Sequence, residues 1–143
     1  MAVLYFDDEP FISRALAEHL RLIYKWNVTL VSEIKDLFDE LNGNEYDIII
    51  LDIMTPVPDF HTFTKREIKE MEDGMSTGIV LAKRIWKNSP DIPILFLSAR
   101  SQPEAISKFK EEGKKCVFLR KPELAETVDT TLDQLLNPKS DEK

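Results

Sequence analysis

The chain has 143 residues, of which 43% are hydrophobic and 31% charged, the size and composition of one soluble domain with its own core. A formal net charge of −7 at pH 7 argues against a nucleic-acid-binding surface, which is normally basic. One cysteine excludes an intramolecular disulfide, and because neither a signal peptide nor an apolar run of roughly 20 residues is present, we expect a cytoplasmic protein without a membrane segment.

Five short apolar runs predict β-strands, and longer amphipathic stretches separate them. The runs are Ala2–Phe6, Val28–Val31, Tyr46–Leu51, Pro93–Leu97 and Cys116–Leu119. Several of them are almost wholly apolar, as is typical of strands that are covered on both faces. Their alternation with helical patterns indicates a parallel α/β sheet.

Three helical patterns lie between the first four runs. Pro10 suits the first turn of the first helix. Ser32 is the expected cap of the second helix, which Gly43 closes. Ser76 is the expected cap of the third helix, which stops before Pro90. Apolar residues recur three to four positions apart in each pattern, so each helix is predicted to pack on the sheet.

Prolines mark the last two helices. Ser101 to Glu104 has the pattern of a capping box with Pro103 at the first helical position, and the fifth helix follows Pro122. Five strands and five helices in strict alternation predict a doubly wound sheet. We expect this domain to occupy residues 1–136, followed by a polar tail over residues 137–143.

An insertion over residues 55–75 separates the third strand from its helix, where a connection of about two to six residues is usual. Within it, Thr64 and Glu67 form a second capping box, which predicts a short inserted helix. Its apolar side carries Phe60, Phe63, Ile68 and Met71. Two interpretations stay open: a tolerated surface insertion, since loops accept length cheaply, or a partner-docking arm or lid. His61 has no second histidine nearby and is expected to face solvent.

Polar side chains stand where four of the predicted strands end. Asp7-Asp8-Glu9 follows the first strand, Asp52 the third, Ser98-Ala99 the fourth and Lys121-Pro122 the fifth. Ligands bind at the carboxyl ends of strands in open α/β sheets, so we expect these groups to converge on one edge. Each motif alone has an ordinary explanation, because acids favour helix N-termini and an aspartate often occupies a turn. Their joint arrangement indicates a functional site.

The chemistry of this group of residues is coherent. Three carboxylates brought together repel one another unless a cation neutralises them. Mg2+ prefers oxygen ligands and is typically held by one or two carboxylates with waters and phosphate oxygens. An aspartate is a known covalent acceptor of phosphate. We therefore predict that Asp52 accepts a phosphoryl group, to which Lys121 supplies a positive charge and the Ser98 hydroxyl a hydrogen bond.

From about Ala2 to Leu136 the chain resembles the receiver domain of bacterial response regulators. Asp52, in the run Leu51-Asp52-Ile53-Met54-Thr55-Pro56, matches the phosphorylated aspartate of that family. The resemblance implies a flavodoxin-like sheet with strand order 2-1-3-4-5 and a magnesium site. Asp8 would be a direct Mg2+ ligand, Asp7 would act mostly through water, and the Met54 carbonyl oxygen would complete the protein's ligands.

The same resemblance assigns the remaining positions. Ser98-Ala99 matches the hydroxyl-plus-small-residue pair of the family's switch, and Lys121-Pro122 matches its lysine and following proline, which a cis bond commonly joins. Phe118 falls on the aromatic residue that changes rotamer with phosphorylation. The 55–75 insertion is the main departure from the family, and Met75-Ser76-Thr77-Gly78 resembles the displaced start of the third helix.

The resemblance implies a signalling module and not a metabolic enzyme. A histidine kinase or phosphotransfer protein would phosphorylate Asp52, and the surface around the fourth helix, fifth strand and fifth helix would change for an unknown downstream protein. Receivers often form homodimers through this face. Neither a nucleic acid nor a membrane is expected as a direct partner.

Two alternatives differ from this hypothesis. A receiver-like interaction module would never take phosphate and would use the 55–75 insertion as its binding surface. A magnesium-dependent hydrolase would form an aspartyl-phosphate intermediate. Haloacid-dehalogenase-like hydrolases carry a second aspartate two residues after the nucleophile, and Met54 occupies that position here.

Overall fold

Five parallel strands form one sheet in the computed structural model, which describes residues 1–58 and 62–138. In spatial order they are β2 (Asn27–Val31), β1 (Ala2–Phe6), β3 (Ile48–Leu51), β4 (Ile94–Ser98) and β5 (Cys116–Arg120). Each neighbouring pair is parallel. The predicted doubly wound sheet and its order 2-1-3-4-5 are confirmed.

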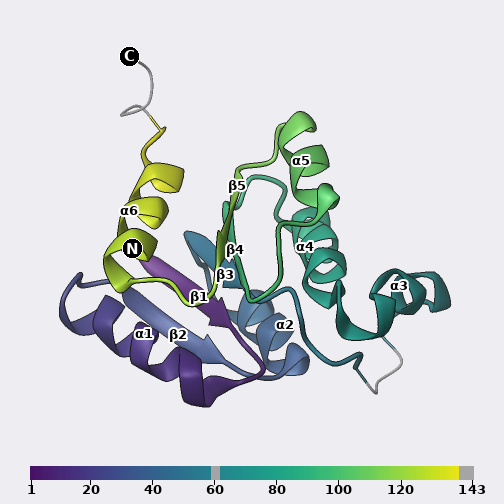
Figure 1. Ribbon diagram of the computed structural model, residues 1–143, viewed down its shortest axis with the longest axis horizontal. Coiled ribbons are helices and arrows are strands. Elements are labelled where there is room, and N and C mark those ends of the chain that lie inside the picture. The colour runs from purple at the N-terminus through teal and green to yellow at the C-terminus, as the bar shows by residue number, and fades with distance from the viewer. Residues whose placement is uncertain (59–61, 139–143) are drawn as a thin grey trace.

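Helices cover both faces of the sheet (Figure 1). On one face lie α1 (Pro10–Leu22) and α6 (Ala125–Leu136), and on the other lie α2 (Ile34–Gly43), α4 (Thr77–Asn88) and α5 (Glu104–Glu111). Because both faces are covered, β3 at the centre of the sheet is fully buried along its whole length. Within the described ranges, no helix is long and apolar enough to cross a membrane.

Successive side chains of each strand point to opposite faces of the sheet and pack into two separate cores. Ile48 and Ile50 face α1 and α6, whereas Ile49 and Leu51 face α2, α4 and α5. Each fully buried side chain of this size stabilises the fold by roughly 1.5–3 kcal/mol. The second core also holds an aromatic cluster of Trp86, Phe96 and Phe109. The sheet edge that carries the polar residues is thus built on a rigid, apolar base.

The observed helix starts correct the predicted caps. Ser32 and Ser101 lie one and two residues before the actual N-cap positions, and neither helix start has a side-chain capping bond. Pro103 is extended (φ −70°, ψ 153°), so α5 begins after this proline and not on it. Ser76 occupies the N-cap of α4, but its hydroxyl donates to Glu72 Oε1 at 2.7 Å. Packing on the sheet outweighs one capping bond of about 1 kcal/mol.

The predicted strands agree with the structure to within one residue at each end, except in β3. That strand begins at Ile48 and not at Tyr46. The Tyr46 hydroxyl donates to Glu40 of α2, and the side chain packs against the edge of the core on that face.

The insertion contains the predicted helix, α3 (Lys65–Glu70), followed by a short 3-10 turn, η1 (Glu72–Gly74). Its capping box is complete. The Glu67 N–H donates to Thr64 Oγ1 at 3.1 Å, and the Thr64 N–H donates to Glu67 Oε1 at 2.8 Å.

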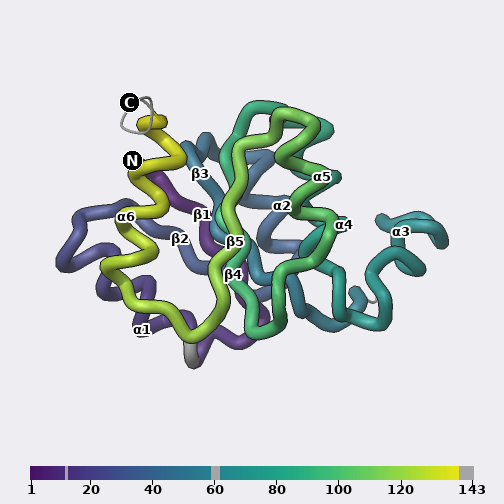
Figure 2. Tube along the Cα trace, turned by 45° about the horizontal axis from the view of Figure 1, so that its top comes forward, coloured from purple at the N-terminus to yellow at the C-terminus, as the bar shows by residue number. Residues whose placement is uncertain are grey.

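Residues 62–75 form an arm that stands out from the body of the molecule beside α4 (Figure 2). Met71 anchors it by being fully buried, and Phe63 packs edge-on against Phe38 of α2, with ring centres 6.4 Å apart. Phe60 was predicted to lie on the apolar side of the insertion and His61 to face solvent. Both residues lie outside the described ranges.

Arg84 of α4 fastens the arm to the body. Its guanidinium donates to both carboxylate oxygens of Glu67, at 2.8 and 3.0 Å, and to the carbonyl oxygen of Thr62. It also lies 4.5 Å from the centre of the Phe63 ring. The hydrogen bonds from Arg84, aided by those from Thr64, hold the pKa of Glu67 at about 2, well below its usual range.

We predict that Glu67→Gln lowers the free energy of unfolding by about 1 kcal/mol at pH 7, and by progressively less as the pH falls. A carboxylate whose pKa is lowered by folding contributes stability above its unfolded pKa near 4.5, and loses it as the pH falls through the folded value near 2. Urea unfolding of both proteins from pH 7 to pH 3 measures the difference. The exposed Glu111→Gln on α5 is the matched control, and a difference that did not vary with pH would contradict the prediction.

Candidate functional site

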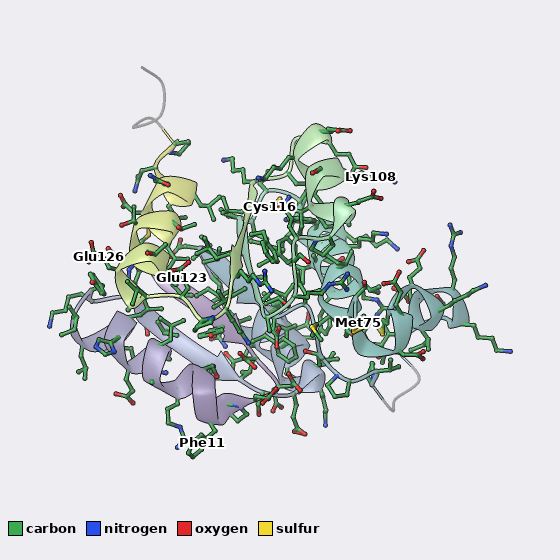
Figure 3. The ribbon with its side chains drawn as sticks, in the orientation of Figure 1. Phe11, Met75, Lys108, Cys116, Glu123 and Glu126 are labelled. Atoms are coloured by element: carbon green, nitrogen blue, oxygen red, sulfur yellow. The ribbon has the colours of Figure 1, made fainter. Side chains whose placement is uncertain are left out.

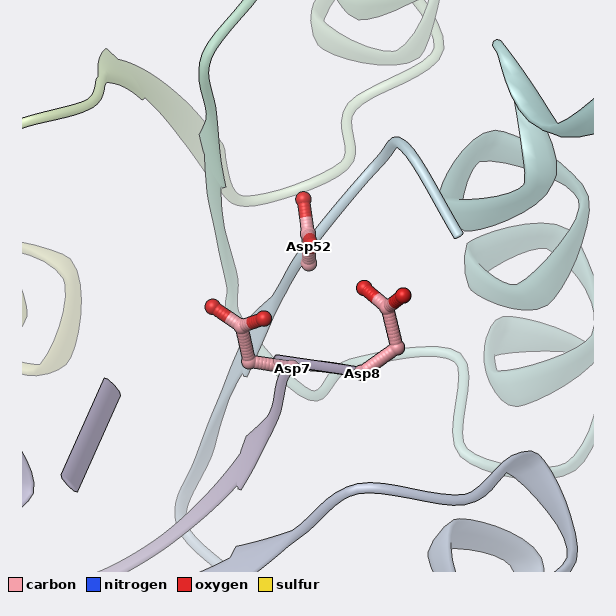
Figure 4. A group of neighbouring side chains, drawn as sticks. All are labelled: Asp7, Asp8 and Asp52. Carbon is pink, nitrogen blue, oxygen red and sulfur yellow. The ribbon is translucent and has the colours of Figure 1, made fainter. Parts of the chain in front are cut away.

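Three carboxylates meet at the carboxyl edge of the sheet (Figure 4). Asp7 and Asp8 follow β1, Asp52 follows β3, and one oxygen from each lies within 4.8 Å of the others. Asp7 and Asp52 are buried, with 1% and 4% of their surface exposed, and Asp8 is half-buried. The parallel sheet therefore brings together at one edge the acidic residues that follow its strands, as predicted.

Lys121, which follows β5, brings a positive charge to this cluster. Its Nζ donates to Asp7 Oδ2 at 2.6 Å and lies 3.5 Å from Asp52 Oδ2. Backbone amides bind the other oxygens: the Glu9 N–H donates to Asp7 Oδ1 at 2.9 Å, and the Met54 N–H donates to Asp52 Oδ1 at 3.3 Å. One ammonium cannot balance three ionised carboxylates, so the cluster keeps an excess of negative charge.

Burial raises the pKa of Asp52 to about 7. Lys121 acts against this shift, and the charges of Asp7 and Asp8 add to it. The pKa of Lys121 is raised as well, because its hydrogen bond to Asp7 and the charge of Asp52 outweigh the opposing effect of burial. A bound divalent cation would relieve the repulsion among the carboxylates, and a donor set of carboxylate oxygens fits Mg2+.

Ser98, the last residue of β4, is fully buried. Its Oγ is the one buried side-chain polar atom with no hydrogen-bond partner in the described part of the chain. Leaving such a hydroxyl unsatisfied costs about 1–3 kcal/mol. The Lys121 N–H donates to the Ser98 carbonyl oxygen at 2.8 Å, so the two predicted residues are direct neighbours. This hydroxyl fits a site that receives an oxyanion.

The start of α4 is pressed against the loop that carries Asp52. The Gly78 N–H donates to the Ile53 carbonyl oxygen at 2.8 Å, and the Thr77 hydroxyl donates to the Thr55 carbonyl oxygen at 2.6 Å. A Cβ on Gly78 would lie 2.3 Å from the Asp52 carbonyl oxygen, so only glycine fits here. The displaced helix start thus returns to a place directly beside the aspartate.

The end of the arm forms one wall of a cavity of about 420 Å³ at the carboxylate cluster. Asp73, Gly74 and Met75 line it together with Asp8 and Asp52. Figure 3 shows Met75 at the foot of the arm, where the arm meets the body. The helix α3 therefore stands beside the site, and only the last turn of the arm reaches the cavity.

Two hydrogen bonds hold this last turn in place. The Thr55 N–H donates to the Gly74 carbonyl oxygen at 3.1 Å, and Arg100 Nη1 donates to the Met75 carbonyl oxygen at 2.7 Å. Thr55 Oγ1 also makes a long contact of 3.5 Å with Asp8 Oδ1. The arm and the carboxylate cluster are therefore parts of one bonded unit.

The remaining predicted residues take two different positions. Met54 lines the same cavity, and its carbonyl oxygen as a metal ligand stays a prediction. Phe118 lies apart from the carboxylates: it is half-buried in β5, pairs in register with Phe96 and packs against the core that faces α4 and α5. Its role as a switch residue stays a prediction. The peptide bond between Lys121 and Pro122 is cis, as predicted.

Four residues at or beside the site were not predicted from the sequence, namely Thr55, Arg100 and the arm residues Asp73 and Met75. Thr55 follows Asp52 by three residues and Arg100 follows Ser98 by two, so their places in the strand-end loops were a usable signal. The arm residues gave no such signal, because the sequence of the insertion does not show which of its residues lie at the sheet edge.

Comparisons with known proteins identify the fold. No family model and no curated protein matches this chain. Among solved structures, the receiver domain of the Francisella response regulator 1452 is 22% identical, with a TM-score of 0.70 over 96% of this chain and 98% of that one. The chemotaxis protein CheY4 of Vibrio cholerae is 24% identical, with a TM-score of 0.72 over 94% of this chain and 98% of that one.

A CheY-like response regulator receiver domain protein from Methanospirillum hungatei is 14% identical, with a TM-score of 0.71 over 99% of this chain and 98% of that one. Likenesses at these identities show the fold alone. The chain has the fold of a response-regulator receiver domain over nearly its whole length.

We predict that Gly78→Ala lowers the free energy of unfolding by about 1–3 kcal/mol, because the new methyl group must displace the Asp52 loop. The matched control is Gly43→Ala at the end of α2, where nothing lies within 4 Å of an added Cβ. That variant should be neutral or more stable by about 0.5–1 kcal/mol. Urea unfolding measures both, and equal effects would contradict the close approach.

We further predict that Asp52→Asn stabilises the metal-free protein by on the order of 2 kcal/mol at pH 8 and by little at pH 4. Folding raises the pKa of Asp52 from 3.8 to about 7, so the native state favours the protonated carboxyl and loses stability as the pH rises through this range. Asparagine, which has no charge, avoids that loss. Added Mg2+ should reduce the difference by stabilising the ionised wild type.

Thermal unfolding from pH 4 to pH 8, with and without MgCl2, measures this effect. The exposed Asp91→Asn, placed before β4 at the opposite end of the sheet, is the control. A stability gain that is the same at both ends of the pH range would disprove the charge explanation.

Proposed function

We propose that this chain is a phosphoaccepting receiver of a two-component system, which takes a phosphoryl group from a histidine kinase or phosphotransfer protein onto Asp52. It is a signalling module and not a metabolic enzyme, because it promotes only its own phosphorylation and dephosphorylation. One observation carries the proposal: Asp52 ends the central strand of a receiver fold as a buried carboxylate beside Asp7, Asp8 and Lys121.

The carboxylates of Asp7, Asp8 and Asp52 are the residues that would hold Mg2+, and the Met54 carbonyl oxygen joins them by resemblance to the receiver family. Bound there, Mg2+ would neutralise charge on the phosphoryl oxygens. The chain's own residues position the acceptor: the Met54 N–H holds one oxygen of Asp52 at 3.3 Å, and the start of α4 fixes the backbone behind it.

In the transfer, the bond between phosphorus and the donor's histidine nitrogen breaks, and a bond forms between phosphorus and a carboxylate oxygen of Asp52. Asp52 must be ionised to supply the electron pair, and a pKa of about 7 leaves a substantial ionised fraction at neutral pH. Lys121 supplies positive charge to the phosphoryl oxygens from its position 3.5 Å from Asp52. The Ser98 hydroxyl, which lacks a partner in the described residues, donates to the same group.

The conformational change on phosphorylation would begin at Ser98. A hydrogen bond to the phosphoryl group draws Ser98 and the β4–α5 loop towards Asp52, and Phe118 changes rotamer as in the receiver family. The surface around α5, β5 and α6 changes as a consequence, and a downstream protein or a second copy of the chain reads that change.

An interaction module that never takes phosphate is the second candidate function. The observation that favours it is the bidentate ion pair between Arg84 and Glu67, which orders the arm without any ligand. On this hypothesis the arm is a preformed binding surface, and the carboxylate cluster has no acceptor role.

We predict that incubation with Mg2+ and acetyl phosphate adds one base-labile phosphoryl group, detected by intact mass. Asp52→Asn should abolish the adduct because it removes the nucleophilic oxygen. Lys121→Ala should reduce its yield at least tenfold, since the positive charge nearest to Asp52 is lost.

Asp91→Asn is the control for the loss of one carboxylate and should leave the adduct unchanged. The absence of an adduct on the wild type would favour the interaction module. An adduct that persists in Asp52→Asn would refute the acceptor, and steady turnover of many phosphate esters would indicate a hydrolase.

A further inference from the structure

Arg100 connects two walls of the cavity at Asp52. It lies two residues beyond Ser98, and its Nη1 donates to the Met75 carbonyl oxygen at 2.7 Å. The neighbouring Ala99 and Met75 itself both line the cavity. The bond therefore joins the β4–α5 loop to the foot of the arm, the point that Figure 3 marks by Met75.

The turn that Arg100 holds is not one that the chain adopts readily. Residues 72–74 have φ values of 50°, 55° and 97°, the left-handed conformation that non-glycine residues rarely take. Such a turn persists only where its surroundings hold it. Here the Thr55 N–H binds the Gly74 carbonyl oxygen on one side, and Arg100 binds the Met75 carbonyl oxygen on the other.

The partners of Arg100 and Met75 are unusual for their residue types. The Arg100 guanidinium binds a backbone carbonyl oxygen, and within the described ranges it forms no ion pair, although the chain has 26 acidic residues. Met75 leaves 43% of a large apolar side chain exposed at the cavity. The bond thus holds the backbone of a residue whose apolar side chain is exposed at the cavity.

We propose that Arg100 is a positioning residue of the phosphorylation site. By holding the Met75 carbonyl oxygen it fixes the end of the arm as a wall of the cavity, and this wall restricts the access of water to a phosphoryl group on Asp52. The proposal rests on the function proposed above, and it ties the lifetime of the phosphorylated state to the arm.

The step it controls is hydrolysis of the acyl phosphate. The oxygen of a water molecule bonds to phosphorus, and the bond between phosphorus and the Asp52 oxygen breaks with its electron pair returning to the carboxylate. Inorganic phosphate leaves and the proton of the water passes to solvent. A looser wall admits water more often, so hydrolysis becomes faster while the acceptor itself is unchanged.

The test measures how long the phosphoryl adduct survives after the phosphodonor is removed, by intact mass in the presence of Mg2+. Arg100→Ala should shorten the lifetime about three- to tenfold, the effect of one hydrogen bond. Arg100→Lys, which can still donate to a carbonyl oxygen, should restore most of it. Met75→Ala should also shorten the lifetime, because it removes the apolar side chain from the wall while the carbonyl oxygen that Arg100 binds is kept.

Arg120→Ala is the matched control. Arg120 Nε donates to the Ala99 carbonyl oxygen at 3.3 Å, so it binds the same loop by the same kind of bond, and it has no hydrogen bond or ion pair to the described arm residues 62–75. Its removal should leave the lifetime unchanged. If it shortens the lifetime as Arg100→Ala does, the loop and not the arm controls hydrolysis, and the proposal fails.

A second measurement uses the unphosphorylated protein. Hydrogen exchange of the bonded amides at positions 55 and 74–76 should be faster in Arg100→Ala, with an unchanged thermal midpoint. Unchanged exchange would overturn the proposal. A wild type that forms no adduct would refute the proposed function, whereas the exchange data would still decide whether Arg100 holds the arm.

Discussion

The charge balance among three buried or half-buried carboxylates is the constraint on which the rest of this molecule depends. Asp7, Asp8 and Asp52 stand close enough to share one ion, and Lys121 neutralises only part of their charge. Burial raises the pKa of Asp52, and within the described residues the buried Ser98 hydroxyl has no hydrogen-bond partner. A cation would satisfy the carboxylates, and an oxyanion would satisfy the lysine and the serine. The residues at this edge could therefore bind a cation and an oxyanion together.

Such a site is costly, and the sheet beneath it supplies the compensating stability. Parallel strands that are covered on both faces bury nearly every side chain, and their carboxyl ends place polar residues from β1, β3, β4 and β5 at one edge. The approach of Gly78 to the Asp52 carbonyl oxygen shows how closely the edge is packed. Because this base is closely packed, we expect a change at Asp52 on the proposed function to move the loops at the edge and not the core.

The sequence was sufficient for those features that depend on periodicity or on a strand end. The five strands and the meeting of Asp7, Asp8, Asp52 and Lys121 were predicted because each follows from an apolar run and the residue after it. The strand order came instead from the resemblance to the receiver family. Capping was predictable only at Thr64, where two reciprocal bonds form in a segment with little tertiary packing. At Ser32 and Ser101, packing on the sheet shifted the helix start, and a local signal could not anticipate that.

The position of the arm's final turn at the cavity could not be predicted from the sequence. An insertion between Asp52 and α4 is constrained at both ends, since it must leave after Pro56 and return so that Gly78 meets the aspartate loop. The described part of the arm, residues 62–75, projects outward (Figure 2), and its final turn lies along the cavity. A partner that binds α3 would therefore act on a segment that is bonded to the proposed acceptor site. On the proposed function, a phosphoryl group that tightens the turn would favour the same partner to the same degree, because such coupling is reciprocal.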